Sequence, residues 1–340
     1  MSNLINYSLL FFISLITTNL LTYLLINYLA LLGVVDVPNK RRAHNKITPR
    51  GGGLAIVIVV IIAFSIFEYL ETEALFYSIR IVPILLTIAT VSFLDDLKPM
   101  PILVRLSIHL ICSTLSVLFF LFPGSLFHQE LPLYIDFILS IIILTAFLNI
   151  YNFLDGIDGI TSAESIHLSI TMLLLCYLKS DIIINLNLII VLNIIILASS
   201  IGFLIFNWHP AQIFLGDVGT ISLGLLIGLC LLLISASSSN LFVASFIASL
   251  YYIADGGLTI LIRLLNKEKI WQPHLKHFFQ KAVKNGKTHT EVVSRITICN
   301  IFLMILSIIS CYEPLIAIIL AMLVVMITLI NFSKKSNEAT

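Results

Sequence analysis

Eleven apolar stretches, each long enough to cross a bilayer, constrain this chain more than any other feature of its sequence. A helix needs about 20 apolar residues to cross ~30 Å of hydrocarbon. The stretches cover residues 5–32, 52–70, 75–94, 102–122, 133–152, 161–178, 182–206, 218–235, 240–265, 292–311 and 314–332. Only 11% of the 340 residues are charged, which is too few for a soluble domain. We therefore predict an all-α, polytopic membrane protein of 10 or 11 transmembrane helices, forming a single domain over residues 1–340.

The basic residues indicate which helix ends face the cytoplasm. Lys and Arg in short loops are retained on the cytoplasmic side, and the loop between the first two stretches is rich in them. If the stretches cross the membrane in strict alternation, 17 of the 19 Lys and Arg residues fall near that side. The two exceptions are Arg80 and Lys179. We expect the N-terminus outside and the C-terminus in the cytoplasm.

Charge and cysteine usage exclude several classes of protein. A net charge of +1 gives no basic excess for nucleic acid. The five cysteines have no Cys-x-x-Cys spacing, so the sequence predicts neither a disulfide framework nor a zinc site. The first apolar stretch is followed by Val-Asp-Val-Pro instead of a small-residue cleavage site, which favours a retained spanning helix over a signal peptide.

Carboxylates gather at helix ends on the predicted cytoplasmic side. Asp95 and Asp96 end the third stretch, where a divalent cation or an acid/base role would relieve their repulsion; a plain Asp-Asp turn is the alternative. The end of the fifth stretch repeats a polar residue at every third position. That row consists of Asn149, Asn152, Asp155 and Asp158. A capped helix end is the simpler interpretation, but four such groups exceed what capping requires, so we favour a metal or ligand role.

Two further segments carry polar groups beside apolar stretches. Asp217 lies between Gly216 and Gly219, where it suits either an N-cap or a Mg²⁺ ligand. On the ninth stretch Asp255, Thr259 and Arg263 share one helical face, and an intrahelical polar stripe is the alternative to a functional role. The basic loop that follows contains His274 and His277. Their spacing of three residues would allow metal binding, but contact with phosphate is the favoured role because no cysteine accompanies them and carboxylates suited to Mg²⁺ lie nearby. Attraction of anionic lipid by a solvated loop is the remaining alternative.

The first basic loop, residues 36–53, ends in Thr-Pro-Arg-Gly-Gly-Gly and lacks the Gly-Lys-Ser/Thr ending of a P-loop. Five loops thus carry the unusual residues, and all five face the predicted cytoplasmic side. Acidic metal ligands beside Arg, His and Lys are what phosphoryl transfer requires, because cations neutralise the diphosphate during in-line attack.

Five motifs in order resemble the polyprenyl-phosphate N-acetylhexosamine-1-phosphate transferases. They are DVPNKRRAHNKITPRGGG, FLDDL, NFLDGIDGI, NWHPAQIFLGDVG and PHLKHFFQ. The branch initiating O-antigen and related surface polysaccharides is the most similar. The resemblance implies transfer of an N-acetylated sugar 1-phosphate (N-acetylglucosamine, N-acetylfucosamine or N-acetylquinovosamine) from a UDP-sugar to undecaprenyl phosphate in a bacterial inner membrane, with release of UMP. It also implies Mg²⁺, with Mn²⁺ as a substitute.

Roles follow from the resemblance position by position. Asn152 and Asp217 would hold Mg²⁺, and Asp95 and Asp96 would lie beside the lipid phosphate. Nucleotide binding or catalysis is implied for Asp155 and Asp158, and diphosphate contact for His274 and His277. The expected substrate contacts are Phe214, which matches a uracil-stacking aromatic, the phosphate clamps Arg50 and Arg263, and Arg41, His44 and Asn149. An aspartate would act either as base or as covalent nucleophile.

Three alternatives stay open. A phospho-N-acetylmuramoyl-pentapeptide transferase is disfavoured because that branch typically has a three-histidine cluster, whereas Leu275 and Lys276 separate His274 from His277. An ion-coupled transporter would place its polar residues near the midplane on interrupted helices. A catalytically inactive lipid-binding scaffold would not need the intact acidic set.

Overall fold

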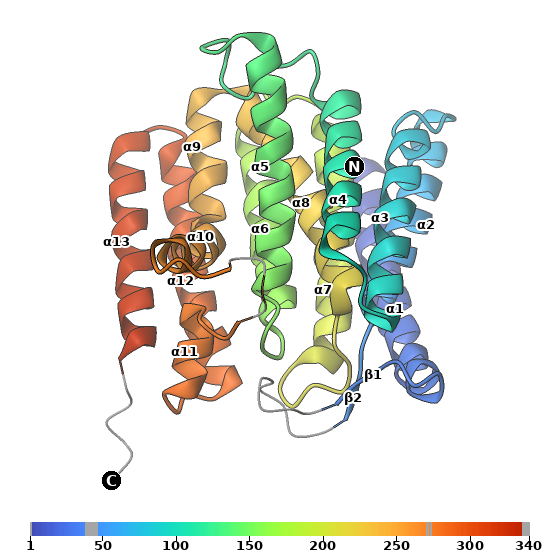
Figure 1. Ribbon diagram of the computed structural model, residues 1–340. Coiled ribbons are helices and arrows are strands. Elements are labelled where there is room, and N and C mark those ends of the chain that lie inside the picture. Colours follow the sequence, from blue (N-terminus) through green and yellow to red (C-terminus); the bar gives the residue numbers. More distant parts are fainter. Residues whose placement is uncertain (1, 38–46, 270–271, 273, 335–340) are drawn as a thin grey trace.

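The computed structural model describes residues 2–37, 47–269, 272 and 274–334, and these fold almost entirely into helices (Figure 1). The predicted substrate contacts Arg41 and His44 lie outside the described residues. The helices are α1 (Ser2–Leu31), α2 (Gly53–Thr72), α3 (Ser78–Leu97), α4 (Ile102–Phe120), α5 (Leu133–Phe153), α6 (Ile160–Leu178), α7 (Leu186–Asn207), α8 (Gly216–Ser237), α9 (Ser239–Ala248), α10 (Leu250–Leu265), α11 (Phe278–Lys284), α12 (His289–Ser310) and α13 (Pro314–Ser333). Strands β1 (Val35–Asp36) and β2 (Thr48–Pro49) form a short antiparallel pair.

Ten helices in the described part of the chain are long and apolar enough to cross a membrane, or eleven spans if α9 and α10 count as one. The all-α polytopic prediction is confirmed. Each of the ten helices corresponds to one predicted stretch, with boundaries that differ by a few residues.

The ninth stretch departs from the prediction because it is not one straight span. Its two helices, α9 and α10, meet at Ser249 with a bend of 71°, and α10 is seen nearly end on in Figure 1. The polar stripe explains the bend, since Asp255, Thr259 and Arg263 are buried against protein while Leu258 and Leu261 remain exposed. Lying across the bundle, α10 keeps its charged groups out of lipid, which is energetically costly for them.

Helix α8 occupies the centre of the bundle. It is apolar on all sides, and the 18 residues of its most apolar window are all buried, as expected of a helix that touches protein all round. It packs against α2, α3, α5 and α9, whereas α1 and α13 at the periphery are mostly exposed. Asp217, in the first turn of α8, is therefore fixed at the centre of one end of the molecule.

A close approach of two glycines joins α2 to α8 at that end. A Cβ atom on Gly53 would lie 2.2 Å from the Cα of Gly219, and one on Gly219 would lie 2.8 Å from the Cα of Gly53. Only glycine permits such contact between the starts of two helices. It brings the first basic loop against the segment that leads into α8.

The described chain begins at one end of the bundle and leaves α13 at the other, as an odd number of crossings requires (Figure 1). The β-strands and α11 lie at the end where α13 finishes. We call this the loop end. Most of the carboxylates identified in the sequence lie at or beside helix termini of this same end, whereas Asp255 lies within α10.

Candidate active site

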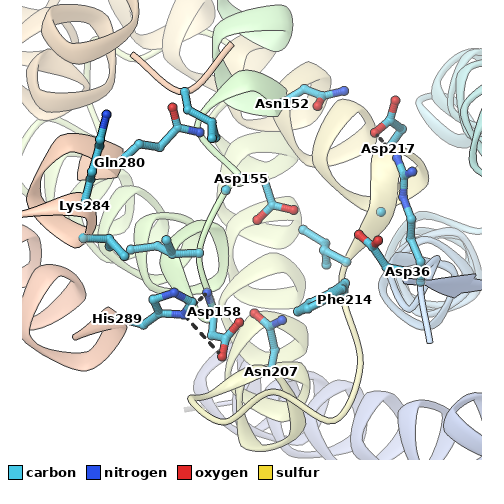
Figure 2. Close-up of a pocket in the computed structure, with 17 residues that line it drawn as sticks. Asp36, Asn152, Asp155, Asp158, Asn207, Phe214, Asp217, Gln280, Lys284 and His289 are labelled. Atoms are coloured by element: carbon cyan, nitrogen blue, oxygen red, sulfur yellow. Dashed lines mark hydrogen bonds and ion pairs between the residues drawn. The ribbon is translucent and has the colours of Figure 1, made fainter. Parts of the chain in front are cut away.

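A cavity of about 640 Å³ opens at the loop end, between the helix termini. Its walls come from four segments distant in the chain, within residues 36–50, 152–158, 207–217 and 275–289. The lining residues are Asp36, Arg50, Asn152, Asp155, Gly156, Ile157, Asp158, Asn207, Phe214, Leu215, Gly216, Asp217, Leu275, Gln280, Val283, Lys284 and His289. Figure 2 shows Gln280, Lys284 and His289 on one side, Asp36 and Asp217 on the other, and Asp155 between them.

Backbone hydrogen bonds join the first basic loop to the segment before α8. Phe214 N–H donates to Pro49 O (2.8 Å), and Gly52 N–H and Gly53 N–H donate to Phe214 O and Leu215 O at 2.9 and 2.8 Å. These bonds continue the short β pairing along the chain. Arg50 and Phe214 are thereby fixed on the same wall of the cavity.

An acid centre lies at the start of α8. We use this term for the carboxylates Asp95, Asp96 and Asp217 with the guanidinium groups of Arg50 and Arg105. Arg50 pairs with Asp96 at 2.7 Å and with Asp217 at 2.8 Å. Burial alone would lower the pKa of Arg50, but Asp96 and Asp217 outweigh this effect and raise it. The arginine is therefore a permanent cation between two carboxylates.

The adjacent residues Asp95 and Asp96 face different partners. Asp95 accepts hydrogen bonds from Met100 N–H (2.6 Å) and Arg105 (2.7 Å). Arg105 also lies 3.6 Å from the second oxygen of Asp217. Asp95 is thus connected to the metal-ligand candidate through one partly exposed arginine.

Asp155 lies in the loop between α5 and α6, where its carboxylate accepts a 2.6 Å hydrogen bond from the Thr161 hydroxyl. Burial raises the pKa of Asp155 to about 6, with Asp217 adding to the rise and the Thr161 bond opposing it. A carboxylate that exchanges its proton near pH 6 is suited to act as a general base.

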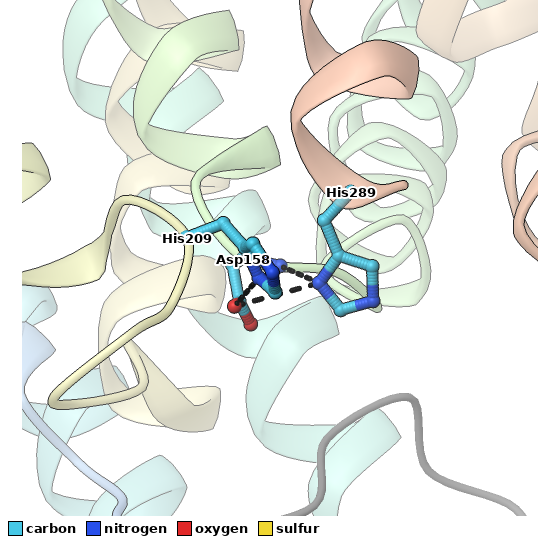
Figure 3. Close-up of side chains that lie close together, drawn as sticks. All are labelled: Asp158, His209 and His289. Atoms are coloured by element: carbon cyan, nitrogen blue, oxygen red, sulfur yellow. Dashed lines mark hydrogen bonds and ion pairs between the residues drawn. The ribbon is translucent and has the colours of Figure 1, made fainter. Parts of the chain in front are cut away.

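Asp158, three residues further along, is held by three donors or potential donors. One of its oxygens lies 2.6 Å from His209 Nδ1 and 3.4 Å from His289 Nδ1, and it accepts from Ala211 N–H at 3.1 Å. Burial would raise the pKa of Asp158, but the hydrogen bonds from His289 and His209 outweigh it and lower the pKa. These three side chains bring ligand atoms within 4.8 Å of one another and are able to hold a metal ion (Figure 3).

The fully buried Asp255 positions the segment that begins α11. Its carboxylate accepts from Phe278 N–H (2.9 Å) and Phe279 N–H (3.1 Å), and His277 Nδ1 lies at 3.2 Å. His274 packs on His277, with ring centroids 4.8 Å apart. Burial lowers the pKa of His274 to about 4, and nearby His277 and Arg263 contribute, so this imidazole is neutral at neutral pH.

The structure gathers most of the residues predicted from sequence, though not all of them in the cavity. Arg50, Asn152, Asp155, Asp158, Phe214 and Asp217 line it. Asn149 instead lies 3.2 Å from His109 within the bundle. The buried Arg263 donates to Lys269 O and Glu268, which stabilises the loop after α10. A phosphate clamp at Arg263 stays a prediction.

Several residues of the site were missed in the sequence. From its position in the sequence, Arg105 marks only the cytoplasmic side, and His209 lies in the motif NWHPAQIFLGDVG without a predicted role. Asn207 accepts from Gly159 N–H (3.2 Å) and donates to Ile213 O (3.0 Å), which connects two walls of the cavity. His289 follows a lysine-rich loop, and only its capping box, Thr288 with Glu291, marked a helix start nearby.

Comparison with known proteins reveals two groups of relatives. A sequence model described as "Glycosyl transferase family 4" matches residues 78–235. A probable undecaprenyl-phosphate N-acetylglucosaminyl 1-phosphate transferase of Bacillus subtilis is 31% identical over 82% of this chain and 78% of its own length. Phospho-N-acetylmuramoyl-pentapeptide-transferases are also similar. The protein from Buchnera aphidicola is 26% identical over 78% of this chain and 85% of its own length. The protein from Orientia tsutsugamushi is 33% identical over 49% of this chain and 48% of its own length.

Proposed function

The chain belongs to glycosyl transferase family 4 and is a polyprenyl-phosphate sugar-1-phosphate transferase, and we propose that it joins a UDP-linked N-acetylated sugar to undecaprenyl phosphate. The donor would carry N-acetylglucosamine, N-acetylfucosamine or N-acetylquinovosamine. The observation that carries this proposal is the acid centre beside a cavity at the ends of membrane-spanning helices. Such a site meets a water-soluble diphosphate on one side and a lipid phosphate on the other.

In the proposed reaction, an oxygen of undecaprenyl phosphate attacks the β-phosphorus of the UDP-sugar. The bond between this phosphorus and the bridging oxygen breaks, and the bridging oxygen leaves with UMP. The product is undecaprenyl-diphosphate-sugar. Nucleophile and leaving group are both phosphates, so catalysis consists mainly of positioning and charge neutralisation.

The donor atoms at the cavity fit Mg²⁺, or Mn²⁺ as a substitute. Asn152 and Asp217 supply oxygen ligands on the same cavity, and Mg²⁺ typically takes one or two carboxylates together with substrate phosphates and water. Bound there, the ion would neutralise charge on the diphosphate. Asn152 and Asp217 are the residues that we assign to hold it.

We assign some of the remaining residues to the UDP-sugar donor and others to the lipid phosphate acceptor. Arg50 lies on the wall of the cavity beside Phe214, so we assign it to the donor diphosphate and Phe214 to the uracil ring. Arg105 and Asp95 lie towards α4, and we assign them to the acceptor phosphate. Asp155, whose pKa is near 6, takes the proton that the acceptor phosphate still carries.

An apolar groove is available for the acceptor's polyprenyl tail. A second cavity of about 510 Å³ lies between α10, α11 and α13, with almost entirely apolar walls and Lys334 at its border. Helix α11 separates the two cavities, since Phe278 lines the groove and Gln280 lines the first cavity. The tail would occupy the groove, with its phosphate directed towards the acid centre.

The proposed role is the first membrane step of O-antigen or related surface-polysaccharide synthesis, on the cytoplasmic face of a bacterial inner membrane. The decisive experiment incubates purified protein with Mg²⁺, undecaprenyl phosphate and a panel of UDP-sugars, including the N-acetylmuramoyl-pentapeptide donor, and identifies the lipid product by mass spectrometry. UMP and a lipid-diphosphate-sugar are expected with one N-acetylhexosamine donor. Solute flux without UMP release would instead identify a transporter.

Orientation is tested separately. A reporter that functions only in the cytoplasm, fused after Thr340, should be active. Activity of an exclusively extracytoplasmic reporter at the same position would contradict the proposed topology.

A further inference from the structure

Three segments far apart in the chain meet at one carboxylate oxygen. Asp158 belongs to the loop between α5 and α6, and His209 to the loop before α8. His289 is the first residue of α12. Figure 3 shows the two imidazole rings converging on Asp158 through their Nδ1 atoms. Their ring centroids lie 4.9 Å apart. The proposed transfer reaction gives neither histidine a part.

We propose that Asp158, His209 and His289 form a binding site for a borderline-soft metal ion such as Zn²⁺. This site is distinct from the proposed Mg²⁺ site at Asn152 and Asp217. The ligand atoms, two imidazole nitrogens and one carboxylate oxygen, all lie within 4.8 Å of one another. Imidazole suits zinc, copper, iron and nickel, whereas Mg²⁺ prefers oxygen ligands. The two sites therefore differ in the ion that they select.

The separations between ligands are close to what a metal ion requires. Two ligands bound to a tetrahedral ion at about 2.0–2.1 Å lie about 3.3 Å apart. His289 Nδ1 and the Asp158 oxygen are already separated by 3.4 Å. The His209–Asp158 separation of 2.6 Å must widen, and the His209 side chain, 42% exposed, has room to move. His289 is buried and fixed at the start of its helix.

The hydrogen-bonding pattern indicates how the ion would enter. His289 Nδ1 is 3.4 Å from both the backbone N–H and the carboxylate of Asp158, which is long for a hydrogen bond to either. That nitrogen is thus held only weakly by its present partners. The N–H at His209 Nδ1 donates a hydrogen bond to the Asp158 carboxylate at 2.6 Å. The ion would take the place of this proton, so binding should release it to solvent.

Occupation of this site should inhibit the transferase. Asp158 and His289 line the cavity, and an ion would fix the α5–α6 loop, the loop before α8 and the start of α12 to one another. An ion there would also occupy one wall of the cavity that the proposed donor enters. Zinc would then act as an inhibitory ion, whereas Mg²⁺ at the oxygen site supports the reaction.

The test is Zn²⁺ titration of the EDTA-treated, purified full chain against a fluorescent chelator in excess Mg²⁺. The wild-type protein should bind one Zn²⁺, releasing a proton, and His209→Ala and His289→Gln should each weaken binding at least about 10-fold. His128→Ala is the control, because this histidine lies in the α4–α5 connection and contacts Ser235 O. It should bind Zn²⁺ like the wild type.

Binding that is unchanged in both histidine variants, or abolished by excess Mg²⁺, would overturn the proposal. Should His289→Gln fail to fold, His209→Ala decides the outcome, because the exposed His209 ring contributes little to packing. Zinc affinity is measured without substrate, so this result is independent of the proposed reaction.

Discussion

Asp96 caps the helix that carries Asp217. Its two carboxylate oxygens accept hydrogen bonds from Asp217 N–H (3.0 Å) and Val218 N–H (3.1 Å), and its side chain is fully buried. A negative charge at a helix N-terminus is stabilising. Of the two adjacent aspartates, Asp96 therefore orders the centre, and the proposed contact with the acceptor phosphate falls to Asp95, which faces Arg105.

Because Asp96 caps the helix and Asp217 is the proposed metal ligand, substitutions at these two residues should affect activity and stability differently. Asp217→Asn should lower UMP release by at least about 100-fold, because it removes charge at the reacting centre, while thermal stability changes little. Asp96→Ala should lower both UMP release and thermal stability, since loss of an N-cap costs about 1 kcal/mol. UMP release and thermal unfolding in the same detergent separate the two effects. Full turnover in Asp217→Asn would refute its role as a metal ligand.

The pH dependence should report Asp155. A base must be deprotonated to act, and burial raises the pKa of Asp155 to about 6. We therefore expect kcat/KM to fall as the pH drops through about 6. Thr161→Val removes the hydroxyl that lowers this pKa, so the acidic limb should move to higher pH.

Thr171→Val is the matched control, because the Thr171 hydroxyl bonds to His167 O within the same helix, away from the cavity. Its profile should follow the wild type. An acidic limb that stays in place in Thr161→Val would assign the titration to another group.

Arg105 should contribute chiefly to acceptor binding. Arg105→Gln removes the cation that bridges Asp95 and Asp217, and we expect the KM for undecaprenyl phosphate to rise about 10-fold with little change for the UDP-sugar, as for loss of a charge-assisted contact. Arg80→Gln serves as control, since Arg80 stacks on Phe76 next to the start of α3, at the other end of that helix from the acid centre. An unchanged acceptor KM would remove Arg105 from the acceptor site.

Asp255 should control the order of the segment that begins α11. Asp255→Asn loses the negative charge that holds two backbone N–H groups and His277, so we expect faster proteolysis within residues 274–284 and lower activity. Asp181→Asn, at an exposed loop position, should leave both unchanged. Wild-type protease resistance in Asp255→Asn would show that packing alone holds the segment.

Sequence alone predicted the spans and most of the carboxylates because both signals are local. An apolar stretch of sufficient length has few alternatives to a spanning helix, and a carboxylate at its end is conspicuous. The bend at Ser249 was missed because neither proline nor glycine marks it. Only the buried stripe of Asp255, Thr259 and Arg263 hinted that the helix could not face lipid.

Residues whose role depends on a distant partner were the ones that sequence reasoning missed. His289 approaches Asp158 across 131 positions. Arg105 reaches Asp95 only because the chain turns between α3 and α4, where Met100 N–H also bonds to Asp95. Periodicity carries no information about such pairs, and a basic residue in a loop is already explained by the orientation of the protein in the membrane.

The pairing of Arg50 with Asp217 has a consequence for how the protein is made. The two residues are separated by 167 positions, and a chain is synthesised and inserted from its N-terminus. Helices α1 to α7 are therefore made before Asp217 and before Phe214 O and Leu215 O, which accept from Gly52 and Gly53. A nascent chain halted before α8 would hold Arg50 beside Asp96 without Asp217, so the acid centre is completed only when α8 has been made.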